Sequence, residues 1–372
     1  MDNQLTAFTP SAPNSVPTAV LDGSIMRRGW TAKAGSRILE SYISPFDATV
    51  VSRTIESGID IIGMTAMNEF GLPTFMTGAE EDIHEAVSTV AQGKASFALC
   101  SDVFGTYRFY APEKGIVYLH PTYGTVSRYG LVPLACSMDQ IGIACKTPAD
   151  GFKFLSIISG NDPKDGAMFP DEHYTYTIPK RKLTIGMPAG ILERLEGAVR
   201  ENIISFSSAF ETREIELKHF DVYKQVMCIL ACAEAGSNLM RYDGIKFGYR
   251  DPSYKSVNDL YTYTRTNALG LDAKLTAIVG FMVLSKENYI PLYEKAMKIR
   301  RLIKESLRFN EYDIIILPTS ISSDSYENLS LYALAPLAGL PSVSFSFKGH
   351  GIQLIANAKN ENVLLSALET VR

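Results

Sequence analysis

Short apolar runs alternate with amphipathic stretches along most of the chain. Runs that are rich in β-branched and aromatic residues, and that are bounded by Gly, Pro or charged residues, are typical of strands. The pattern predicts strands at residues 59–64, 96–100, 115–119, 182–187, 313–318 and 342–347. Stretches with a 3.6-residue apolar period predict helices at residues 48–57, 80–92, 149–159, 192–210, 220–238, 274–284, 291–309 and 360–371.

The alternation of strands and helices predicts an α/β fold, with a mixed, mostly parallel sheet flanked by helices in an α/β/α arrangement. Residues 1–17 are rich in Pro, Ser, Thr and Asn and are expected to form an irregular N-terminal tail. The N-terminus has no basic segment followed by an apolar stretch, and no run of about 18 apolar residues occurs. We therefore expect neither a Sec signal nor a membrane span.

Charge and cysteine content narrow the function further. The net charge is −4 over 372 residues, so no global basic field attracts nucleic acid, although a local tRNA-facing patch stays open. The five cysteines lie mostly in apolar surroundings, which indicates reduced thiols in a cytoplasmic protein. Cys228 and Cys232 are spaced as a possible metal pair on a predicted helix, but no second Cys/His pair accompanies them. We therefore expect no metal site.

Several phrases of the sequence occur together in one family. They are SRILESYISPFDATVV (36–51), HPTYGTVSRYGLVPLACSMDQIG (120–142), AEAGSNLMRYDGIKFGYR (233–250) and PLAGLPSVSF (336–345). In these phrases and their order the chain resembles the amidase-signature family, in particular the A subunits of glutamyl-tRNA(Gln) amidotransferases. The resemblance implies an amidase-signature fold, formed by residues 18–372 as one domain without the family's usual N-terminal helical region. It implies no cofactor.

The resemblance also implies a catalytic unit made of a Ser nucleophile, a bridging Ser in a Gly/Ser-rich loop and a Lys. A hydroxyl is a poor nucleophile near neutral pH unless a base takes its proton, and a buried, neutral Lys can serve that purpose. Here the matching positions are Leu21 for the Lys, Ile83 for the bridging Ser and Thr106 for the nucleophile. Around Thr106 the chain keeps the family's residues at Asp102, Gly105 and Arg108.

The substrate-binding positions differ from the family in the same way. The acidic residue of the family's glutamine pocket corresponds to Leu329, and the arginines of its binding helix correspond to Leu275 and Thr276. The ammonium and carboxylate of a free amino acid would lose these partners, and neither charge is buried cheaply without one. The resemblance thus predicts that substrate recognition and catalysis are lost together.

Three functions follow from these residues. The first is a catalytically degenerate homologue, a pseudoenzyme kept as a binding or scaffolding subunit. Its partner would be related to the amidotransferase B or C subunits or be an active A-type subunit, and tRNA would be reached only through that complex. The second is an active amidase or amidotransferase that cleaves a C–N bond with Thr106 as nucleophile and a non-family base, such as His84. The third is binding of a small apolar ligand in the vacated cavity.

Arg241, Tyr242 and Tyr249 are further binding candidates. They follow a predicted helix and are expected on one side of a cleft, together with Asp243. They could contact a ligand or partner, or they could hydrogen-bond the helix to its following loop.

Overall fold

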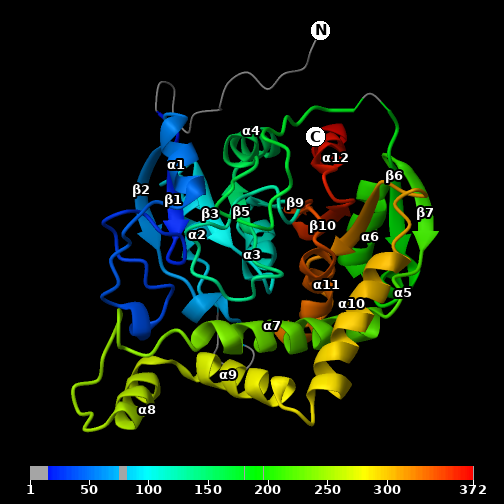
Figure 1. Ribbon diagram of the computed structural model, residues 1–372. Helices are drawn as coiled ribbons and strands as arrows, with labels where there is room; N and C mark the ends of the chain where they lie inside the picture. The colour runs from blue at the N-terminus through cyan, green and yellow to red at the C-terminus, as the bar shows by residue number, and fades with distance from the viewer. Residues whose placement is uncertain (1–15, 75–81, 180, 196, 372) are drawn as a thin grey trace.

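The computed structural model describes residues 16–74, 82–179, 181–195 and 197–371. Within them, ten strands form a single mixed sheet (Figure 1). Most of the tail predicted at residues 1–17 lies outside the described residues, as does the beginning of the helix predicted at 80–92. From one edge to the other, the strands are β2 (Asp60–Thr65), β1 (Thr18–Asp22), β3 (Phe97–Ser101), β5 (Ile141–Cys145), β4 (Val117–His120), β9 (Ser342–Phe347), β10 (His350–Ala356), β8 (Ile314–Pro318), β6 (Thr184–Pro188) and β7 (Glu211–Ile215).

The prediction of a mixed sheet is confirmed, but the prediction that it is mostly parallel is wrong. Strands pair in parallel only at the two ends, where β2, β1 and β3 meet and where β8, β6 and β7 meet. The five pairings between β3 and β8 are antiparallel. Strand direction depends on where each connection returns the chain, and apolar runs alone do not encode it.

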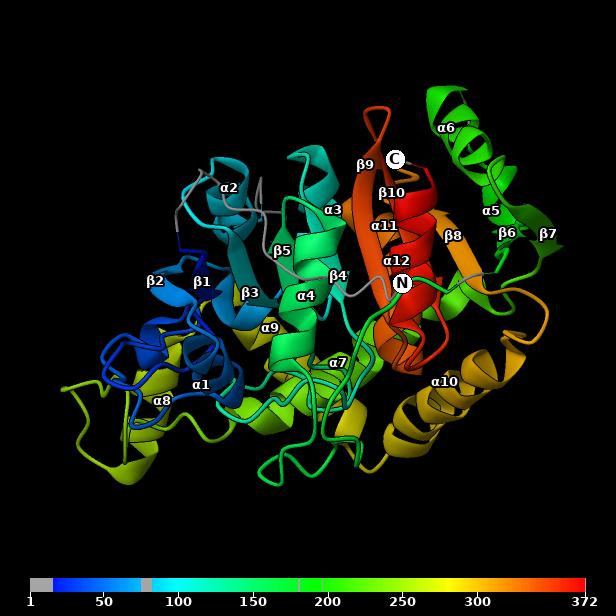
Figure 2. The same cartoon turned by 90° about the horizontal axis from the view of Figure 1, so that it is seen from above.

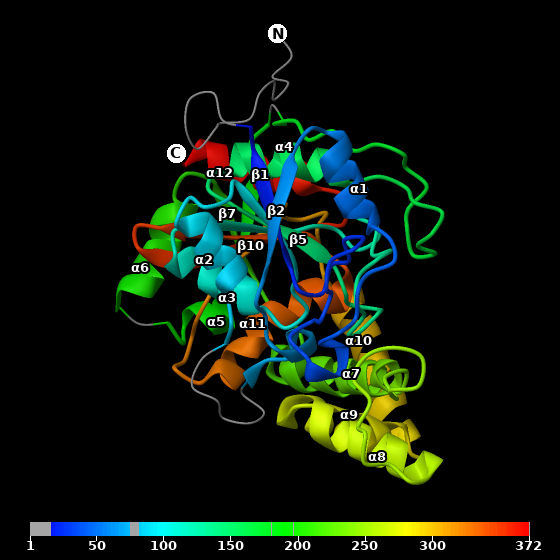
Figure 3. The same ribbon diagram turned by 90° about the vertical axis from the view of Figure 1, so that its left-hand side faces the viewer.

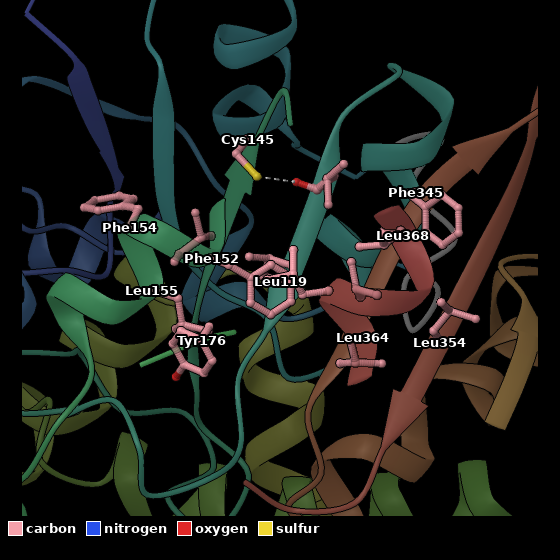
Figure 4. Close-up of a cluster of buried hydrophobic side chains, with 14 of the residues drawn as sticks. Leu119, Cys145, Phe152, Phe154, Leu155, Tyr176, Phe345, Leu354, Leu364 and Leu368 are labelled. Carbon is pink, nitrogen blue, oxygen red and sulfur yellow. Dashed lines mark hydrogen bonds between the residues drawn. The ribbon is translucent and has the colours of Figure 1, made fainter. Parts of the chain in front are cut away.

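One face of the sheet is covered by α1 (Thr49–Glu56), α4 (Pro148–Ile158), α6 (Gly197–Ser207) and α12 (Glu361–Thr370). Leu119 of β4, Phe152 of α4 and Leu364 of α12 belong to one buried cluster on this face (Figure 4). The thiol of Cys145 donates to the Val117 carbonyl at 3.7 Å within the same cluster. Apolar residues from both halves of the sheet thus share one core.

The opposite face is covered by α2 (Glu85–Ala91), α3 (Thr106–Glu113) and α11 (Ser325–Ala338). Beyond α11 lie α7 (Tyr223–Leu239) and then α9 (Leu271–Leu284), which packs along α7 at the bottom of the molecule (Figure 1). The remaining helices are α5 (Ala189–Leu192) beside β6, α8 (Val257–Ala268), and α10 (Lys295–Ser306), which follows a π-helix at Tyr289–Glu294. Seen along the β2 edge, α8 and α9 form the outermost layer (Figure 3).

All six predicted strands and most predicted helices are present, with ends shifted by a few residues. The predicted helix at 192–210 is interrupted, because α5 ends at Leu192 and α6 begins at Gly197. The predictions missed β1, β5, β7, β10, α3, α8 and α11. Helix α11 gives no amphipathic signal because its residues from Asn328 to Ala338 are all buried.

Candidate functional site

The turn between β3 and α3 holds Thr106 and depends on a glycine. Gly105 is the N-cap of α3 and has φ of +95°, a left-handed conformation that L side chains rarely adopt. A Cβ atom at this position would lie 2.3 Å from Cγ of Tyr332. Only glycine lets α3 begin here against α11, and Thr106 is therefore placed as the first residue of α3.

Asp102 and Arg108 stabilise this turn through buried hydrogen bonds. The Asp102 carboxylate accepts hydrogen bonds from the backbone N–H groups of Gly105 at 2.9 Å and Arg108 at 3.0 Å, and from Nε of Arg108 at 3.1 Å. The Arg108 guanidinium also donates to the carbonyl oxygens of Tyr332 at 2.9 Å and Val103 at 3.0 Å. Both side chains are buried, so these two binding candidates shape the backbone around Thr106 and do not line the cavity beside it.

A small cavity of about 60 Å³ lies beside Thr106. The cavity brings together two positions that the sequence had linked, Thr106 and Leu329. Aromatic side chains from α3, from the turn before it and from α11 make up much of its wall. The lining residues among the described part of the chain are Pro73, Asp82, Phe104, Gly105, Thr106, Phe109, Tyr110, Ser325, Asn328, Leu329 and Tyr332.

Leu21 and Ile83 do not line this cavity. Leu21 is fully buried in the cluster beneath α1 and α4, whereas its neighbour Val20 packs with Tyr107 of α3. Successive strand residues point to opposite faces, so Leu21 points away from the face that carries Thr106. Ile83 precedes α2 and its side chain is 44% exposed.

Asp82 is a cavity residue that the sequence analysis did not single out. Its carboxylate accepts hydrogen bonds from Nδ2 of Asn68 at 2.6 Å and from the backbone N–H of Thr74 at 2.9 Å. The base considered from the sequence, His84, lies outside the lining; its ring stacks on Tyr110 with centroids 4.0 Å apart. No sequence motif marks Asp82 as a cavity residue. It lies beside Thr106 because of the course of the chain before α2, which only the structure shows.

A buried carboxyl group follows Leu21. Asp22 accepts hydrogen bonds from the hydroxyl and backbone N–H of Ser24 and from the backbone N–H of Ser101. Burial raises its pKa to about 6, against the effect of these hydrogen bonds. Asp22 therefore joins β1 to the end of β3, and it is not among the residues that line the Thr106 cavity.

The sheet beneath α3 and α11 carries a second polar group of residues. His120 of β4 pairs with Ser342 of β9, and Gln353 of β10 pairs with Ser344 of β9, so all four side chains share one face. All four are buried. Burial and, next, the nearby Arg108 guanidinium hold the pKa of His120 well below its usual value of 6.5. Its surroundings in the folded protein thus favour the neutral form of this histidine.

Arg241, Tyr242 and Tyr249 are engaged in local contacts. Arg241 donates to the carbonyl and side chain of Asn238 at the end of α7. Tyr242 is buried and stacks on Phe70, and the Tyr249 hydroxyl donates to Asp251 at 3.2 Å. Of the three, Arg241 hydrogen-bonds to helix α7, and none of the three residues lines the Thr106 cavity.

Comparison with known proteins defines the class to which this fold and site belong. A family model described as amidase matches residues 86–365. The chain therefore belongs to the amidase family, the amidase-signature family expected from its sequence phrases. Among the described residues, no helix is both long and apolar enough to cross a membrane.

Within that family the chain is similar to A subunits of glutamyl-tRNA(Gln) amidotransferase. It is 34% identical to that subunit from Carboxydothermus hydrogenoformans, in a match that covers 96% of this chain and 82% of the relative. It is 31% identical to the subunit from Neisseria meningitidis, covering 100% of this chain and 86% of the relative. The crystal structure of the subunit from Thermotoga maritima superimposes with a TM-score of 0.76 at 26% identity, covering 95% of this chain and 82% of that one.

A more distant structure confirms the fold alone. The peptide amidase of Stenotrophomonas maltophilia superimposes with a TM-score of 0.75 at 22% identity, covering 95% of this chain and 82% of that one. The predicted amidase-signature α/β fold, with its sheet flanked by helices, is thereby confirmed.

Proposed function

We propose that this protein is a catalytically degenerate homologue of the glutamyl-tRNA(Gln) amidotransferase A subunit that acts as a binding or scaffolding subunit. The proposal rests on the loss of a coupled unit, as the sequence resemblance implies it. The resemblance matches Thr106 to the nucleophile and Leu21 and Ile83 to the two positions that would take its proton. When the members of such a unit act together, losing one of them removes most of the catalysis.

The size of the Thr106 cavity is the observation that carries this proposal. Ligand sites typically have about 300–1,000 Å³, whereas this cavity has about 60 Å³. Phe104, Phe109 and Tyr332 line it, together with Leu329, which the sequence resemblance matches to an acidic residue of the family. The volume suits a few water molecules, which argues against both glutamine and a sizeable apolar ligand.

The direction of Leu21 adds a second argument. Its side chain belongs to the core beneath α1 and α4 and is fully buried. An amine on that face would be buried among apolar side chains, and that cluster contains no anionic partner for it. A single reversion to lysine would therefore not rebuild the catalytic relay.

The partner is proposed from the relatives. They are named subunits of glutamyl-tRNA(Gln) amidotransferase, so the retained fold suits association with a B-type or C-type subunit or with an active A-type subunit. In such a complex tRNA would be bound through the partner, because this chain carries a net charge of −4.

The test is ammonia release from glutamine. The purified protein would be assayed alone and with B-type and C-type amidotransferase subunits, beside Thr106→Ala and an active A subunit as positive control. We expect the wild type to equal Thr106→Ala in every mixture, while size-exclusion chromatography detects its complex with the added subunits. Ammonia that depends on Thr106 would contradict the loss of catalysis, and the absence of any complex would contradict the scaffolding role.

One observation favours an active enzyme as the second candidate. Asp82 and Thr106 line the same cavity, and a carboxylate can act as a general base for a hydroxyl nucleophile. In that case Thr106→Ala and Asp82→Asn would each abolish turnover of a small amide or ester. His84→Gln would have little effect, because His84 lies outside the lining.

A further inference from the structure

The lining of the Thr106 cavity carries negative charge. Among the described residues that line it, Asp82 is the only one with a charged side chain. The Arg108 guanidinium belongs to the neighbouring turn, but it is paired with the Asp102 carboxylate at 3.1 Å. That pair is neutral as a whole, so it leaves the charge of Asp82 uncompensated.

The Asp82 side chain is held in place before any ligand arrives. Its Oδ1 atom accepts from Nδ2 of Asn68 at 2.6 Å and from the backbone N–H of Thr74 at 2.9 Å. The Asn68 side chain is itself fixed, since its carbonyl oxygen accepts from the backbone N–H of Ile83 at 2.7 Å. No donor among the described residues reaches Oδ2 of Asp82. This oxygen can therefore accept from a ligand with little further cost of ordering.

The free polar atoms of the cavity are acceptors. Within the described part of the chain, no residue hydrogen-bonds the Thr106 hydroxyl, whose oxygen can accept beside Asp82. The Asn328 side chain is already occupied, because it hydrogen-bonds the loop after β8. The Tyr332 hydroxyl likewise donates to the Thr319 carbonyl. The lining thus favours a ligand that donates hydrogen bonds.

The walls and the volume restrict the ligand further. Aromatic rings attract cations through their negative faces, and four of them line the cavity, those of Phe104, Phe109, Tyr110 and Tyr332. The volume is about 60 Å³, whereas one water molecule needs about 10–15 Å³. A ligand of about two to four non-hydrogen atoms fits this space.

We propose that the Thr106 cavity binds a small protonated primary amine of the size of methylammonium or ethylammonium. The ammonium group donates to the Asp82 carboxylate and to the Thr106 hydroxyl, and the alkyl group contacts the aromatic wall. An alkylammonium group has three donors and no acceptor, which matches the free acceptors of the cavity. The inference rests on the proposed function, because it requires a cavity that no longer serves glutamine hydrolysis.

The test is a titration of the purified full chain with methylammonium chloride at about pH 7, where alkylamines are protonated. The chain carries carbon-13 in its leucine methyl groups, and the ionic strength is held constant with sodium chloride. Leu329 lines the cavity and is 2% exposed, so its methyl resonances in the NMR spectrum report on the cavity. We expect saturable shifts with a Kd of about 10 mM, the limit for a ligand of two non-hydrogen atoms.

Two further probes separate charge from size. Methanol has nearly the size of methylammonium but no charge, and it should shift the Leu329 resonances much less. Tetramethylammonium has the charge but no N–H donor and is too large for the cavity, so it should leave them unchanged. Glutamine should also leave them unchanged.

Two variants test the two acceptors. Asp82→Asn keeps an oxygen for Asn68 and Thr74 but removes the charge, and it should weaken binding at least about 5-fold, as for loss of a partly exposed ion pair. Thr106→Val keeps the shape of the side chain and should weaken binding by a few fold. Asp60→Asn is the matched control, because Asp60 is an exposed carboxylate outside the cavity. It should bind like the wild type.

The proposal is overturned if methylammonium leaves the Leu329 resonances unchanged up to about 100 mM, or if methanol binds equally well. It is also overturned if Asp82→Asn and Thr106→Val both bind like the wild type. Circular dichroism verifies that each variant is folded. Ammonia release from glutamine decides the proposed function separately, so the failure of either idea is recognised without the other.

Discussion

The guanidinium of Arg108 lies 3.1 Å from the carboxylate of Asp102, and both side chains are buried at the turn that places Thr106. Arg108 also joins this turn to α11 through the Tyr332 carbonyl. The pair belongs to the backbone scaffold of the turn, so its role in this structure is in folding.

Arg108→Met tests the contribution of this pair to stability. The variant leaves the Asp102 charge buried without its cation, and it leaves the Tyr332 and Val103 carbonyls without a donor. Breaking a buried pair in this way costs about 3–5 kcal/mol. Urea unfolding should detect the loss, and Arg301→Met on exposed α10 is the control because its pair with Glu305 is exposed. A change below about 1 kcal/mol would mean that the buried pair contributes little.

Leu21→Lys tests whether the family's lysine can return. The ammonium group would be placed in the core beneath α1 and α4 without an anionic partner in that cluster. We expect the free energy of unfolding to fall by at least about 3 kcal/mol, with no gain in ammonia release. Leu21→Met, which conserves volume, should cost less than about 1.5 kcal/mol. A stable Leu21→Lys protein with new glutaminase activity would disprove our account of this position.

Gly280→Ala tests the contact between α7 and α9. The added methyl group would meet the Cys232 carbonyl at 2.1 Å, so the helices must separate, at a cost of about 1–3 kcal/mol. Gly190→Ala is the matched control in α5, because nothing lies within 4 Å of a Cβ atom there. Thermal unfolding of both variants gives the comparison. Equal stability of the two variants would show that α9 can move away from α7 without a loss of unfolding free energy.

His120 predicts a pH dependence of stability. Its pKa is held well below 6.5 in the folded protein, so on acidification the unfolded chain binds a proton that the folded chain does not. Stability is therefore lost as the pH falls below about 6.5, by at most about 1.4 kcal/mol per pH unit. His120→Gln should remove this part of the loss. The measurement is the difference in unfolding free energy between variant and wild type from pH 7 to pH 5.

Asp22 is a control because it is expected to change stability with pH in the opposite direction to His120. Its pKa is raised from 3.8 to about 6, so the folded state keeps a proton that the unfolded state has released between these values. This contribution falls as the pH rises from about 4 to 6. Asp22→Asn should flatten the profile in that window, opposite in direction to His120→Gln. If both variants shifted the profile in the same direction, the assignment of His120 would be wrong.

The local pattern of the sequence was sufficient for many elements of the fold. Strand β9 occupies the predicted residues 342–347 because its apolar and polar positions alternate between two clearly different faces. Strand β7 was not predicted because most of its residues are exposed, and α11 was not predicted because nearly all of its residues are buried. Neither element shows the contrast between faces on which such predictions depend.

The sequence predicted only some of the residues that line the candidate site. Family phrases brought Thr106 and Leu329 to one site, and both line the cavity. Position matching could not reveal which face of the sheet Leu21 occupies. In the structure Leu21 pairs with Leu99 of β3 on one face, and Val20 lies on the other. It also could not find Asp82, whose approach to Thr106 is created by the course of the chain before α2.

The order of the strands divides the chain into two consecutive halves. Residues 18–145 form β2, β1, β3, β5 and β4, and residues 184–356 form β9, β10, β8, β6 and β7. The halves join along three residue pairs between β4 and β9, centred on Leu119 and Val343. A chain cut between α4 and β6 would give two fragments, each with an unpaired strand at the cut surface of its sheet. An unpaired strand edge of this kind promotes aggregation unless another strand pairs with it. Each fragment would therefore need the other fragment to complete its sheet.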